Sequence, residues 1–491
     1  MQRNVAADFF AAASGRLDDP FLIDADTTIT YRTFYERVRR FAGALDTAGA
    51  RPGDRVLVQV EKSPEAVALY LACLWAGAVH VPLNPTFTAD ERTYFIDDSR
   101  PAVVVVDPAV AADATWLTLA ADGTGTLVER AASATPRSKP MPRADDDLAA
   151  ILYTSGTTGR PKGAALTHEG LRRNARALHD TWRFGPSDHL VHALPLFHVH
   201  GLFVALHCAL LAAIPVTFLR RFDVDTVLDG FVNGTVFMGV PTHYARLCGS
   251  ERLTPDACAT MRLFTCGSAP LTETAFADFH TRTSHTICER YGMSETGITT
   301  SNPYDGDRLA GTVGYPLPGV AAQIIDEDGS ALPRGAIGVL AIRSRQVMRE
   351  YWGRPDATAE AHTDDGWFIT GDVASMADDG RITLQGRASD MIISGGENIY
   401  PKEIELVLDE IDGIVESAVV GIPDPDFGER VVAVLVCDGE PLDEAELRPH
   451  LDARLARFKH PRRIEIVEAL PRNAMGKVQK GGLRDRYSAA D

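Results

Sequence analysis

The chain has 491 residues, of which 45% are hydrophobic and 24% are charged, as in ordinary globular proteins. This length predicts about two to four domains rather than one core. The formal net charge of −18 argues against generic binding to nucleic acids or anionic membranes, since both favour a basic face. An anionic substrate must therefore meet positive charge that is concentrated locally.

Seven cysteines are present without any Cys-x-x-Cys pair, and several lie in apolar surroundings. This usage favours free thiols in a reducing cytoplasm over disulfides or a zinc site. Residues 1–15 lack the continuous apolar core of a signal peptide. We therefore expect a cytoplasmic protein.

Strand and helix signals alternate through the first part of the chain. Arg55–Val60 is predicted to be a strand and Pro64–Trp75 a helix, while Val79–Pro82 and Ala102–Val106 are short apolar runs typical of buried parallel strands. Ala131–Arg143 is rich in Ser, Pro and basic residues and is predicted to be a loop. This alternation predicts a layered α/β architecture.

The segment Tyr153–Gly163 reads Tyr-Thr-Ser-Gly-Thr-Thr-Gly-Arg-Pro-Lys-Gly and follows an apolar run, Leu148–Leu152, that predicts a buried strand. Glycines allow close approach of the backbone, and N–H groups, hydroxyls and cations bind anionic oxygens, so a polyphosphate fits. The segment is not the common P-loop, because Lys162 is followed by glycine rather than Ser or Thr. The candidate binding residues are Thr154, Ser155, Gly156, Thr157, Thr158, Gly159 and Lys162.

Helical spacing resumes after this loop, with apolar residues from Leu171 to Trp182. Gly201–Leu219 is mostly apolar but contains a histidine and a proline, which favours a buried helix to about Ala213 followed by a strand over a membrane span. Gly319–Ser344 then alternates short strands with Asp-Gly and Arg-Gly turns, which predicts a β-rich subdomain.

The pattern of predicted elements changes after Gly386-Arg387. Helices are predicted at Lys402–Leu408 and Asp443–Phe458, and strands at Val415–Ile422 and Arg430–Cys437. The predicted fold is therefore α/β: a large domain, residues 1–389, of layered α/β subdomains plus a β-rich subdomain, followed by a small α+β domain, residues 390–491.

Four further motifs occur in order along the chain. They are Gly267–Pro270 (Gly-Ser-Ala-Pro), Glu289–Thr296 (Glu-Arg-Tyr-Gly-Met-Ser-Glu-Thr), Thr370–Asp372 with Gly386-Arg387, and Pro471–Lys480. Together with Tyr153–Gly163 they resemble the acyl-adenylate-forming enzymes, which include acyl-CoA synthetases, adenylation domains of peptide synthetases and firefly-type luciferases. The resemblance extends over essentially the whole chain, beginning at Thr30-Tyr31.

The resemblance implies roles in binding ATP and Mg²⁺. Tyr291 would pack on the adenine, Glu295 would hold Mg²⁺, and Thr296 would bond a phosphate oxygen. A single carboxylate plus substrate phosphates suits Mg²⁺, which retains several waters. The family's Asp and Arg at Asp372 and Arg387 bind the ribose hydroxyls. Other implied nucleotide-site residues are Gly267, Ser268, Ala269 and Gly292.

The resemblance also implies a mobile small domain. Lys477 matches the lysine that stabilises the transition state when two anions meet at the α-phosphate. Asp390 would be the hinge, and Gly395 and Gly396 would form the tunnel for CoA. Many relatives carry Lys where Ser389 stands here, so a cation beside the hinge is missing. The implied catalytic residues are Lys477, Glu295, Thr154 and His198.

The acid to be activated is indicated by Arg290 and by the turn containing His198 and His200. A buried guanidinium is costly without an anion, and Arg binds carboxylates through two hydrogen bonds, so a second carboxylate on the substrate is a natural partner. Pairing of Arg290 with Glu289 or another acid is the structural alternative. The motifs Glu289–Met293, His198–Gly201 and Ser301–Gly306 together resemble those of malonyl-CoA synthetases. Ser268 is a further candidate substrate residue. Ile298, where such enzymes often carry Met, is predicted to shape the pocket and to admit 2-substituted malonates such as methylmalonate.

The sequence therefore predicts an ATP-dependent, AMP-forming ligase that joins malonate to CoA in the cytoplasm. The alternatives are a CoA ligase for another short, medium or aromatic acid, an adenylating ligase that loads a carrier protein, and a nucleotide-binding protein without catalysis. Its expected partners are the small molecules ATP, a dicarboxylic acid and CoA, without nucleic acid or a membrane span. Monomer and homodimer both remain open.

Overall fold

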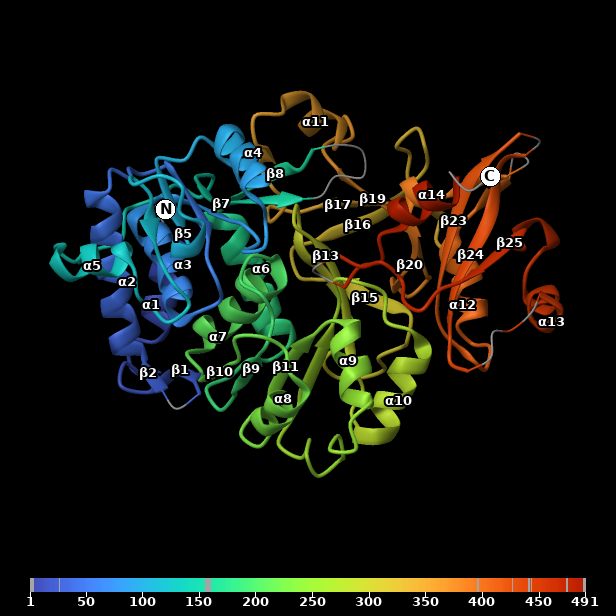
Figure 1. Cartoon of the computed structure of the whole chain (residues 1–491), viewed down its shortest axis with the longest axis horizontal. Coiled ribbons are helices and arrows are strands. Elements are labelled where there is room, and N and C mark those ends of the chain that lie inside the picture. Colours follow the sequence, from blue (N-terminus) through green and yellow to red (C-terminus); the bar gives the residue numbers. More distant parts are fainter. Residues whose placement is uncertain are drawn as a thin grey trace.

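The computed structural model describes residues 4–25, 27–154, 160–394, 397–425, 427–439, 442, 444–473 and 476–488. Figure 1 shows a large N-terminal part, blue to yellow, and a smaller C-terminal part, orange to red, on its right-hand side. The predicted loop residues Ser155, Gly156, Thr157, Thr158 and Gly159, and the predicted tunnel residues Gly395 and Gly396, lie outside the described residues.

The first sheet confirms the predicted short buried strands. Its order is β18-β8-β7-β4-β3-β5-β6, and β7, β4, β3, β5 and β6 pair in parallel. The strands β7 and β8 form an antiparallel pair on either side of the glycine-rich loop, so that Thr154 lies opposite Lys162. The strands are β3 (Arg55–Gln59), β4 (Val79–Pro82), β5 (Val103–Val106), β6 (Leu117–Thr118), β7 (Leu148–Thr154), β8 (Lys162–Thr167) and β18 (Glu350–Tyr351).

A longer run of paired strands crosses the rest of the large domain, in the order β16-β17-β19-β20-β15-β14-β13-β12-β11-β9-β10-β1-β2. The pairs from β13 to β1 are parallel, whereas the pairs from β16 to β14 are antiparallel and form the predicted β-rich part. The strands are β1 (Pro20–Asp24), β2 (Thr27–Thr30), β9 (Leu190–His192), β10 (Val216–Phe218), β11 (Val236–Gly239), β12 (Leu263–Cys266), β13 (Cys288–Met293), β14 (Gly297–Ser301), β15 (Thr312–Pro316), β16 (Ala321–Ile325), β17 (Ile337–Arg343), β19 (Phe368–Met376) and β20 (Ile382–Arg387).

Helices cover these sheets. The helix α3 is apolar on all sides, and every residue of it except Glu65 is buried, so its length of 13 residues, rather than a periodic spacing, marks it as a core helix. The helices of the large domain are α1 (Val5–Ala12), α2 (Tyr31–Thr47), α3 (Pro64–Ala76), α4 (Ala89–Ser99), α5 (Thr126–Ser133), α6 (His168–Thr181), α7 (Leu206–Ala212), α8 (Val224–Phe231), α9 (Pro241–Cys248), α10 (Glu273–Thr283) and α11 (Pro355–Glu360).

Two sequence predictions in this domain need comment. The predicted loop Ala131–Arg143 begins too early, because α5 continues to Ser133. Leu127 and Ala131 of this helix pack into the core. The apolar stretch Gly201–Leu219 contains a π-helical turn, then α7, then β10. This order confirms the prediction of a buried helix followed by a strand. Across the described ranges, no helix combines the length and apolarity needed to cross a membrane.

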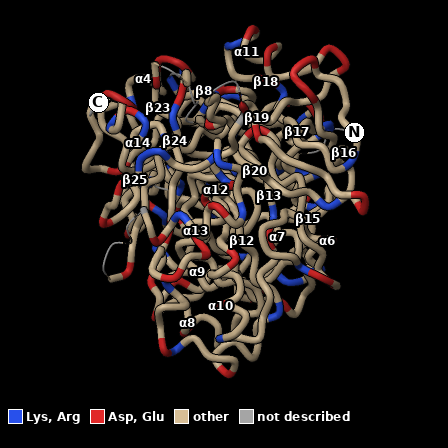
Figure 2. The backbone as a smooth tube through the Cα atoms, turned by 90° about the vertical axis from the view of Figure 1, so that its right-hand side faces the viewer, with Lys and Arg blue, Asp and Glu red and all other residues tan. Residues whose placement is uncertain are grey.

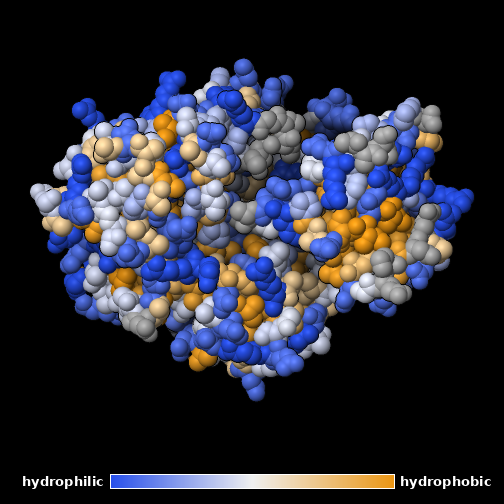
Figure 3. Space-filling view, in the orientation of Figure 1, coloured by the Kyte–Doolittle hydropathy of each residue, from blue (hydrophilic) through white to orange (hydrophobic). Residues whose placement is uncertain are grey.

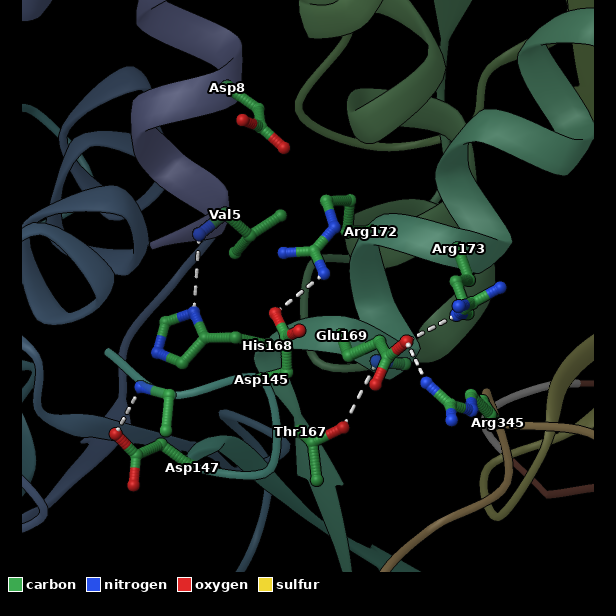
Figure 4. A network of polar contacts seen from close by, with 12 residues as sticks. Val5, Asp8, Asp145, Asp147, Thr167, His168, Glu169, Arg172, Arg173 and Arg345 are labelled. Atoms are coloured by element: carbon green, nitrogen blue, oxygen red, sulfur yellow. Dashed lines mark hydrogen bonds and ion pairs between the residues drawn. The ribbon is translucent and has the colours of Figure 1, made fainter. Parts of the chain in front are cut away.

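The start of α6 is fixed by a polar network (Figure 4). The backbone N–H of Val5, at the start of α1, donates to His168 Nδ1 over 3.3 Å. On the other side, Glu169 accepts from Arg173 over 2.6 Å and from Arg345 over 3.3 Å. These contacts join α1, α6 and the segment after β17, and so hold the helix that follows the β7–β8 pair.

The small domain is an α+β unit. The strands β21 (Ile392–Ser394), β22 (Glu397–Ile399), β23 (Ile414–Asp424), β24 (Gly428–Cys437) and β25 (Arg463–Ile466) form one sheet, with α12 (Pro401–Leu408), α13 (Glu444–Arg454) and α14 (Lys480–Ser488). The predicted helix Asp443–Phe458 is too long, since α13 ends at Arg454 and a 3₁₀ turn occupies Arg457–Lys459. Sheet membership changes between β20 and β21, and the predicted boundary at 389/390 falls in that stretch.

The surface reflects both the charge and the two-part shape. In the view of Figure 2, acidic positions lie mainly on the outer turns, with basic positions between them. Figure 3 shows a hollow where the two parts meet, and an apolar area over α12 and β24. The segment before α14 bridges this junction, because a Cβ added at Gly476 would lie 3.3 Å from the Thr242 side chain of α9.

Candidate active site

Three strands bring Tyr291, Asp372 and Arg387 together. Tyr291 Oη donates to Asp372 Oδ2 over 2.5 Å, and Arg387 Nε is 2.8 Å from Asp372 Oδ1. Arg387 Nη1 also donates to the Thr370 carbonyl over 3.2 Å. Because Asp372 on β19 lies directly opposite Arg387 on β20, strand register fixes this pair. The structure therefore joins the predicted adenine and ribose residues into one unit.

Burial dominates the electrostatics of this unit. It raises the pKa of Asp372, although Arg387 and the Tyr291 hydroxyl favour the ionised form. Burial, the largest single influence, would lower the pKa of Arg387, but Asp372, Tyr291 and Glu295 together outweigh it and raise that pKa. The pair is a charged edge of the cleft that could bind vicinal hydroxyls through the free lone pairs of the carboxylate.

Glu295 lies in the turn between β13 and β14 and is 5% exposed. Its Oε1 accepts from Tyr351 Oη over 3.0 Å, and burial raises its pKa. No cluster of three His, Cys, Asp or Glu side chains suited to a metal ion occurs among the described residues. One carboxylate with substrate phosphates is, however, a donor set that Mg²⁺ accepts. Thr296 is fully buried, and its hydroxyl donates to the Gly297 carbonyl over 2.9 Å.

The ends of the glycine-rich loop lie near this carboxylate. Lys162 Nζ is 5.3 Å from the centroid of the Tyr351 ring, and Thr154 Oγ1 donates to the Lys162 carbonyl over 3.4 Å. Tyr351 thus contacts both Glu295 and Lys162, a link that the sequence offered no motif to predict. The arrangement places one cation and one carboxylate beside the loop, as polyphosphate binding with Mg²⁺ requires.

Lys477 comes to the cleft from the small domain. Its side chain as a whole is exposed, yet desolvation by the cleft walls lowers its pKa, and Arg387 lowers it further. Asp372 and Glu295 oppose this shift, so Lys477 lies within electrostatic reach of both carboxylates. The neighbouring Gly476 passes close to α9, since an added Cβ there would lie 3.3 Å from the Thr242 side chain. The structure therefore brings the predicted lysine to the predicted nucleotide residues.

Arg290 lies one residue before Tyr291 on β13 and points to the opposite face, because side chains alternate along a strand. Glu289, on the face of Tyr291, accepts from the Gly311 N–H over 3.2 Å. Within the described ranges, no carboxylate forms an ion pair with Arg290, which is 4% exposed. The geometry therefore does not support the alternative that Arg290 pairs with Glu289.

Space for the guanidinium is provided by Gly267, just after β12. A Cβ at this glycine would lie 2.4 Å from Arg290 Nη1, so any larger residue would displace the side chain. Two buried nitrogens of Arg290, Nε and Nη2, have no hydrogen-bond partner. Burial lowers the pKa of Arg290 to about 10, which leaves it charged at neutral pH. An unpaired buried cation of this kind calls for an anionic ligand.

The histidine turn borders the same space. His200 is 2% exposed, its Nδ1 is 3.5 Å from Ser268 Oγ, and its Nε2 has no partner; His198 Nε2 is likewise buried without a partner. Burial lowers the pKa of His198 to about 3, with Lys477 adding to the effect. It also lowers that of His200 well below its usual value, with Arg290 as the next cause. Both rings are therefore neutral and can donate one hydrogen bond each.

Sequence reasoning missed His243 in this group. It lies on α9, its buried Nδ1 has no partner, and its charge would act on His200. The usable signal was position: α9 follows the carboxyl end of β11, as Gly267 follows that of β12, and such ends are where α/β sheets bind ligands.

Ile298 has a different setting from the other predicted substrate residues. It is 2% exposed and packs in the main core, while its backbone is held on both sides by Asn174 and by Gln346. Its neighbour Gly297 has φ +62°, and an added Cβ would lie 2.7 Å from Asn174 Oδ1. The pocket-shaping role of Ile298 stays a prediction.

The predicted hinge residue, Asp390, closes a 3₁₀ turn at Ala388–Asp390. Arg484 Nη2 of α14 donates to Asp390 Oδ1 over 3.5 Å, at the start of the small domain. Arg484 therefore supplies a positive charge beside Asp390. Motion about Asp390 stays a prediction.

A two-part α/β chain with a charged nucleotide face, a glutamate beside a glycine-rich hairpin and a lysine contributed by the small domain has the architecture of an adenylate-forming enzyme. Comparison with known proteins agrees. Residues 9–352 match the family described as AMP-binding enzyme, and residues 403–477 match the AMP-binding enzyme C-terminal domain. The chain belongs to the AMP-binding enzyme family.

Several characterised proteins are similar to this chain. The crystal structure of ATP-bound MatB from Rhodopseudomonas palustris superimposes with a TM-score of 0.96 at 47% identity, covering 100% of both chains. A malonate–CoA ligase of Arabidopsis thaliana is 34% identical over 89% of this chain and 78% of its own length. A feruloyl-CoA synthase of Amycolatopsis is 35% identical over 94% of each chain. These relatives share the fold but act on different acids.

Proposed function

We propose that this protein is an ATP-dependent, AMP-forming ligase that converts malonate to its CoA thioester in the cytoplasm. Its similarity to a malonate–CoA ligase over most of the chain supports this assignment. The seven cysteines, none of them in a disulfide, favour a reducing compartment. Neither observation separates malonate from another acid, because a feruloyl-CoA synthase is equally similar.

The observation that carries the choice of malonate is the buried, unpaired guanidinium of Arg290. A hydrocarbon or aromatic acyl group would leave Arg290 Nε and Nη2 without partners in an enclosed space, at a cost of about 1–3 kcal/mol for each lost polar contact. A distal carboxylate would satisfy both nitrogens, and the neutral rings of His198 and His200 could donate to it. The pocket therefore favours a short dicarboxylate.

In the first reaction, the proximal carboxylate of malonate attacks the α-phosphorus of ATP, a P–O bond forms, and pyrophosphate leaves. Arg290 holds the distal carboxylate, which fixes the direction of the proximal one. Lys477 lies within reach of the phosphate face and stabilises charge that develops at the reacting phosphoryl group. Asp372 and Arg387 hold the ribose, and Tyr291 packs on the adenine.

Glu295 would hold Mg²⁺ on the phosphates with Thr296 nearby, and the ion would neutralise charge on the departing pyrophosphate. Thr154, Lys162 and the loop between them would bind the phosphate oxygens. In the second reaction, the CoA thiol loses its proton and attacks the carbonyl carbon of malonyl-adenylate, and AMP leaves. The small domain would rotate about Asp390 between the reactions, withdrawing Lys477 and admitting the segment at Gly395 and Gly396.

The test is a panel of acids assayed for pyrophosphate and acyl-CoA with CoA present. The panel contains malonate, methylmalonate, succinate, propionate, benzoate and ferulate. Malonate should give the highest kcat/KM, with methylmalonate lower by no more than about 200-fold, because one methyl group is worth only about 1–3 kcal/mol of discrimination. A monocarboxylic acid that equals malonate would contradict the assignment. If product forms only when a carrier protein is the acceptor, the acceptor in the proposed reaction is that protein and not CoA.

A further inference from the structure

Beneath the histidine turn lies a buried lysine that the proposed reaction does not use. Lys62, between β3 and α3, is 8% exposed. Its Nζ is 2.8 Å from His192 Nδ1, 3.0 Å from the His192 carbonyl and 2.8 Å from the Leu194 carbonyl. No carboxylate of the described chain pairs with it; the ammonium instead lies 4.7 Å from the centroid of the Phe218 ring. Such an arrangement is unusual, since lysine is rarely buried without a paired anion.

Counting protons fixes the charge of the pair. His192 Nε2 is 3.0 Å from the Gly201 carbonyl, so the two side chains make four contacts in all. Each contact needs one hydrogen on nitrogen, because the carbonyls only accept and two lone pairs cannot bond. A neutral Lys62 and a neutral His192 carry three such hydrogens. Four are present if either lysine or histidine is protonated, so the pair holds a single positive charge.

Burial lowers the pKa of Lys62 and that of His192, which opposes a second proton on the pair. Asp24 favours the charged lysine from a distance, and it is already paired with Arg220. The ring of Phe218 also favours one cation, since aromatic faces attract ammonium groups. The hydrogen-bond count therefore requires one charge, which Phe218 and Asp24 favour and which burial opposes.

The Lys62–His192 pair affects the acyl pocket in two ways. Its contacts hold the two ends of the segment that carries the histidines: His192 and Leu194 at one end and Gly201 at the other. Its charge also acts on the pocket, because His192 affects His200. Lys62 acts likewise on His243, the pocket histidine on α9. The segment between these anchors contains His198 and His200.

We propose that Lys62 is a positioning residue for the acyl pocket. With His192 it fixes the histidine turn and holds one positive charge beneath the site of the distal carboxylate. The pocket then offers two cations, this pair and Arg290, to a substrate with a second negative charge. The inference rests on the proposed function, and it adds a residue from the connection between β3 and α3 to a pocket otherwise built from β9 to β13.

A purely structural role is the competing explanation. A buried cation could hold two loops together and have no effect on which acid is bound. Such a role predicts that loss of Lys62 lowers the thermal midpoint, or affects all acids alike. An electrostatic role predicts that only substrates with a second negative charge are affected. Malonamate, which differs from malonate by an amide in place of one carboxylate, separates these cases.

The experiment compares the full-length wild type with Lys62→Met and Lys62→Gln. Met retains the length of the side chain without charge, and replacing buried ions by apolar residues of similar volume is often tolerated. Gln retains two N–H donors without charge, and it carries the test if the Met variant does not fold. Arg92→Met is the matched control: Arg92 is a buried cation on α4 whose Nη1 donates to Gln59 and whose guanidinium lies 5.6 Å from the centroid of the Trp116 ring, without contact to the histidine turn in the described part of the chain.

For each enzyme, KM and kcat are measured for malonate and malonamate with ATP saturating, and KM for ATP with the acid saturating. Both Lys62 variants should raise the malonate KM by about tenfold, as expected for one charge lost at medium range. The malonamate KM and the ATP KM should change by less than about twofold, and Arg92→Met should change none of them.

Equal changes in the malonate and malonamate KM, or no change in either, would overturn the role of Lys62 while leaving malonate as the substrate. A wild-type enzyme that uses both acids equally would overturn the proposed function and this inference together. The comparison of malonate with malonamate in the wild type alone therefore distinguishes failure of the proposed function from failure of the role of Lys62.

Discussion

The proposed nucleotide face (Tyr291, Asp372 and Arg387) and the proposed acyl pocket (Arg290, His198 and His200) both include residues of strand β13, yet their polar groups differ in whether they have hydrogen-bond partners. On one side of the strand, Tyr291, Asp372 and Arg387 bind one another and need no ligand to complete their hydrogen bonds. On the other side, Arg290 and His200 leave buried nitrogens without partners. A self-satisfied site is pre-organised for a substrate common to the family. An unsatisfied one depends on a ligand of complementary charge.

Lys477 offers the largest effect, because it is the cation that reaches the nucleotide face from the small domain. Lys477→Ala should lower the rate of adenylation, followed as pyrophosphate release, by about a thousandfold. Thioester formation from supplied malonyl-adenylate should stay within about threefold of wild type. Equal loss of both half-reactions would show that Lys477 instead supports the fold of the small domain.

Asp372→Asn tests whether the nucleotide face is independent of the acyl pocket. The variant retains the shape of the side chain but loses the charge that pairs with Arg387, so KM for ATP should rise by about tenfold or more. The ratio of kcat/KM for malonate to that for malonamate should not change. A variant that alters this ratio would mean that the two faces of β13 are coupled.

Glu289 gives a smaller effect, on stability. Burial raises its pKa to about 8, well above the unfolded value of roughly 4.3, so the folded protein binds the extra proton between these pH values. Stability therefore falls as pH rises through that window. Glu289→Gln should remove this loss, exceeding the wild-type thermal midpoint by about 2 °C or more at pH 8 but not at pH 5. Parallel pH profiles for the two proteins would contradict the assignment.

Local pattern was enough to predict the elements whose burial is complete. Buried strands such as β4 and the apolar helix α3 are encoded in consecutive residues, so the sequence predicted them within one or two positions. The strand β8 was not predicted, because it follows the glycine-rich loop and is recognisable only through its pairing with β7. The end of α13 was missed for the same reason: nothing local marks Arg454 as its last residue.

The site residues divide in the same way, into those that a local motif marks and those that only the fold brings together. Motifs identified Tyr291, Asp372 and Arg387, which come together because β13, β19 and β20 lie in one run of paired strands. Tyr351 and Lys62 carry no motif, and their contacts arise from chain segments more than fifty residues from their partners. A lone lysine after a strand is normally a solvated surface charge. Only burial in the folded protein marks Lys62 as different.

The central claim is that Arg290 binds the second carboxylate of the substrate, and a cycle of two enzymes and two acids tests it most directly. The wild type and Arg290→Met are each assayed for kcat/KM with malonate and malonamate. The wild type should prefer malonate by about a hundredfold, and the variant by about tenfold or less, which is the share left to the Lys62–His192 pair. The same preference in both enzymes would contradict the account, because the charge on the acid would then be recognised elsewhere.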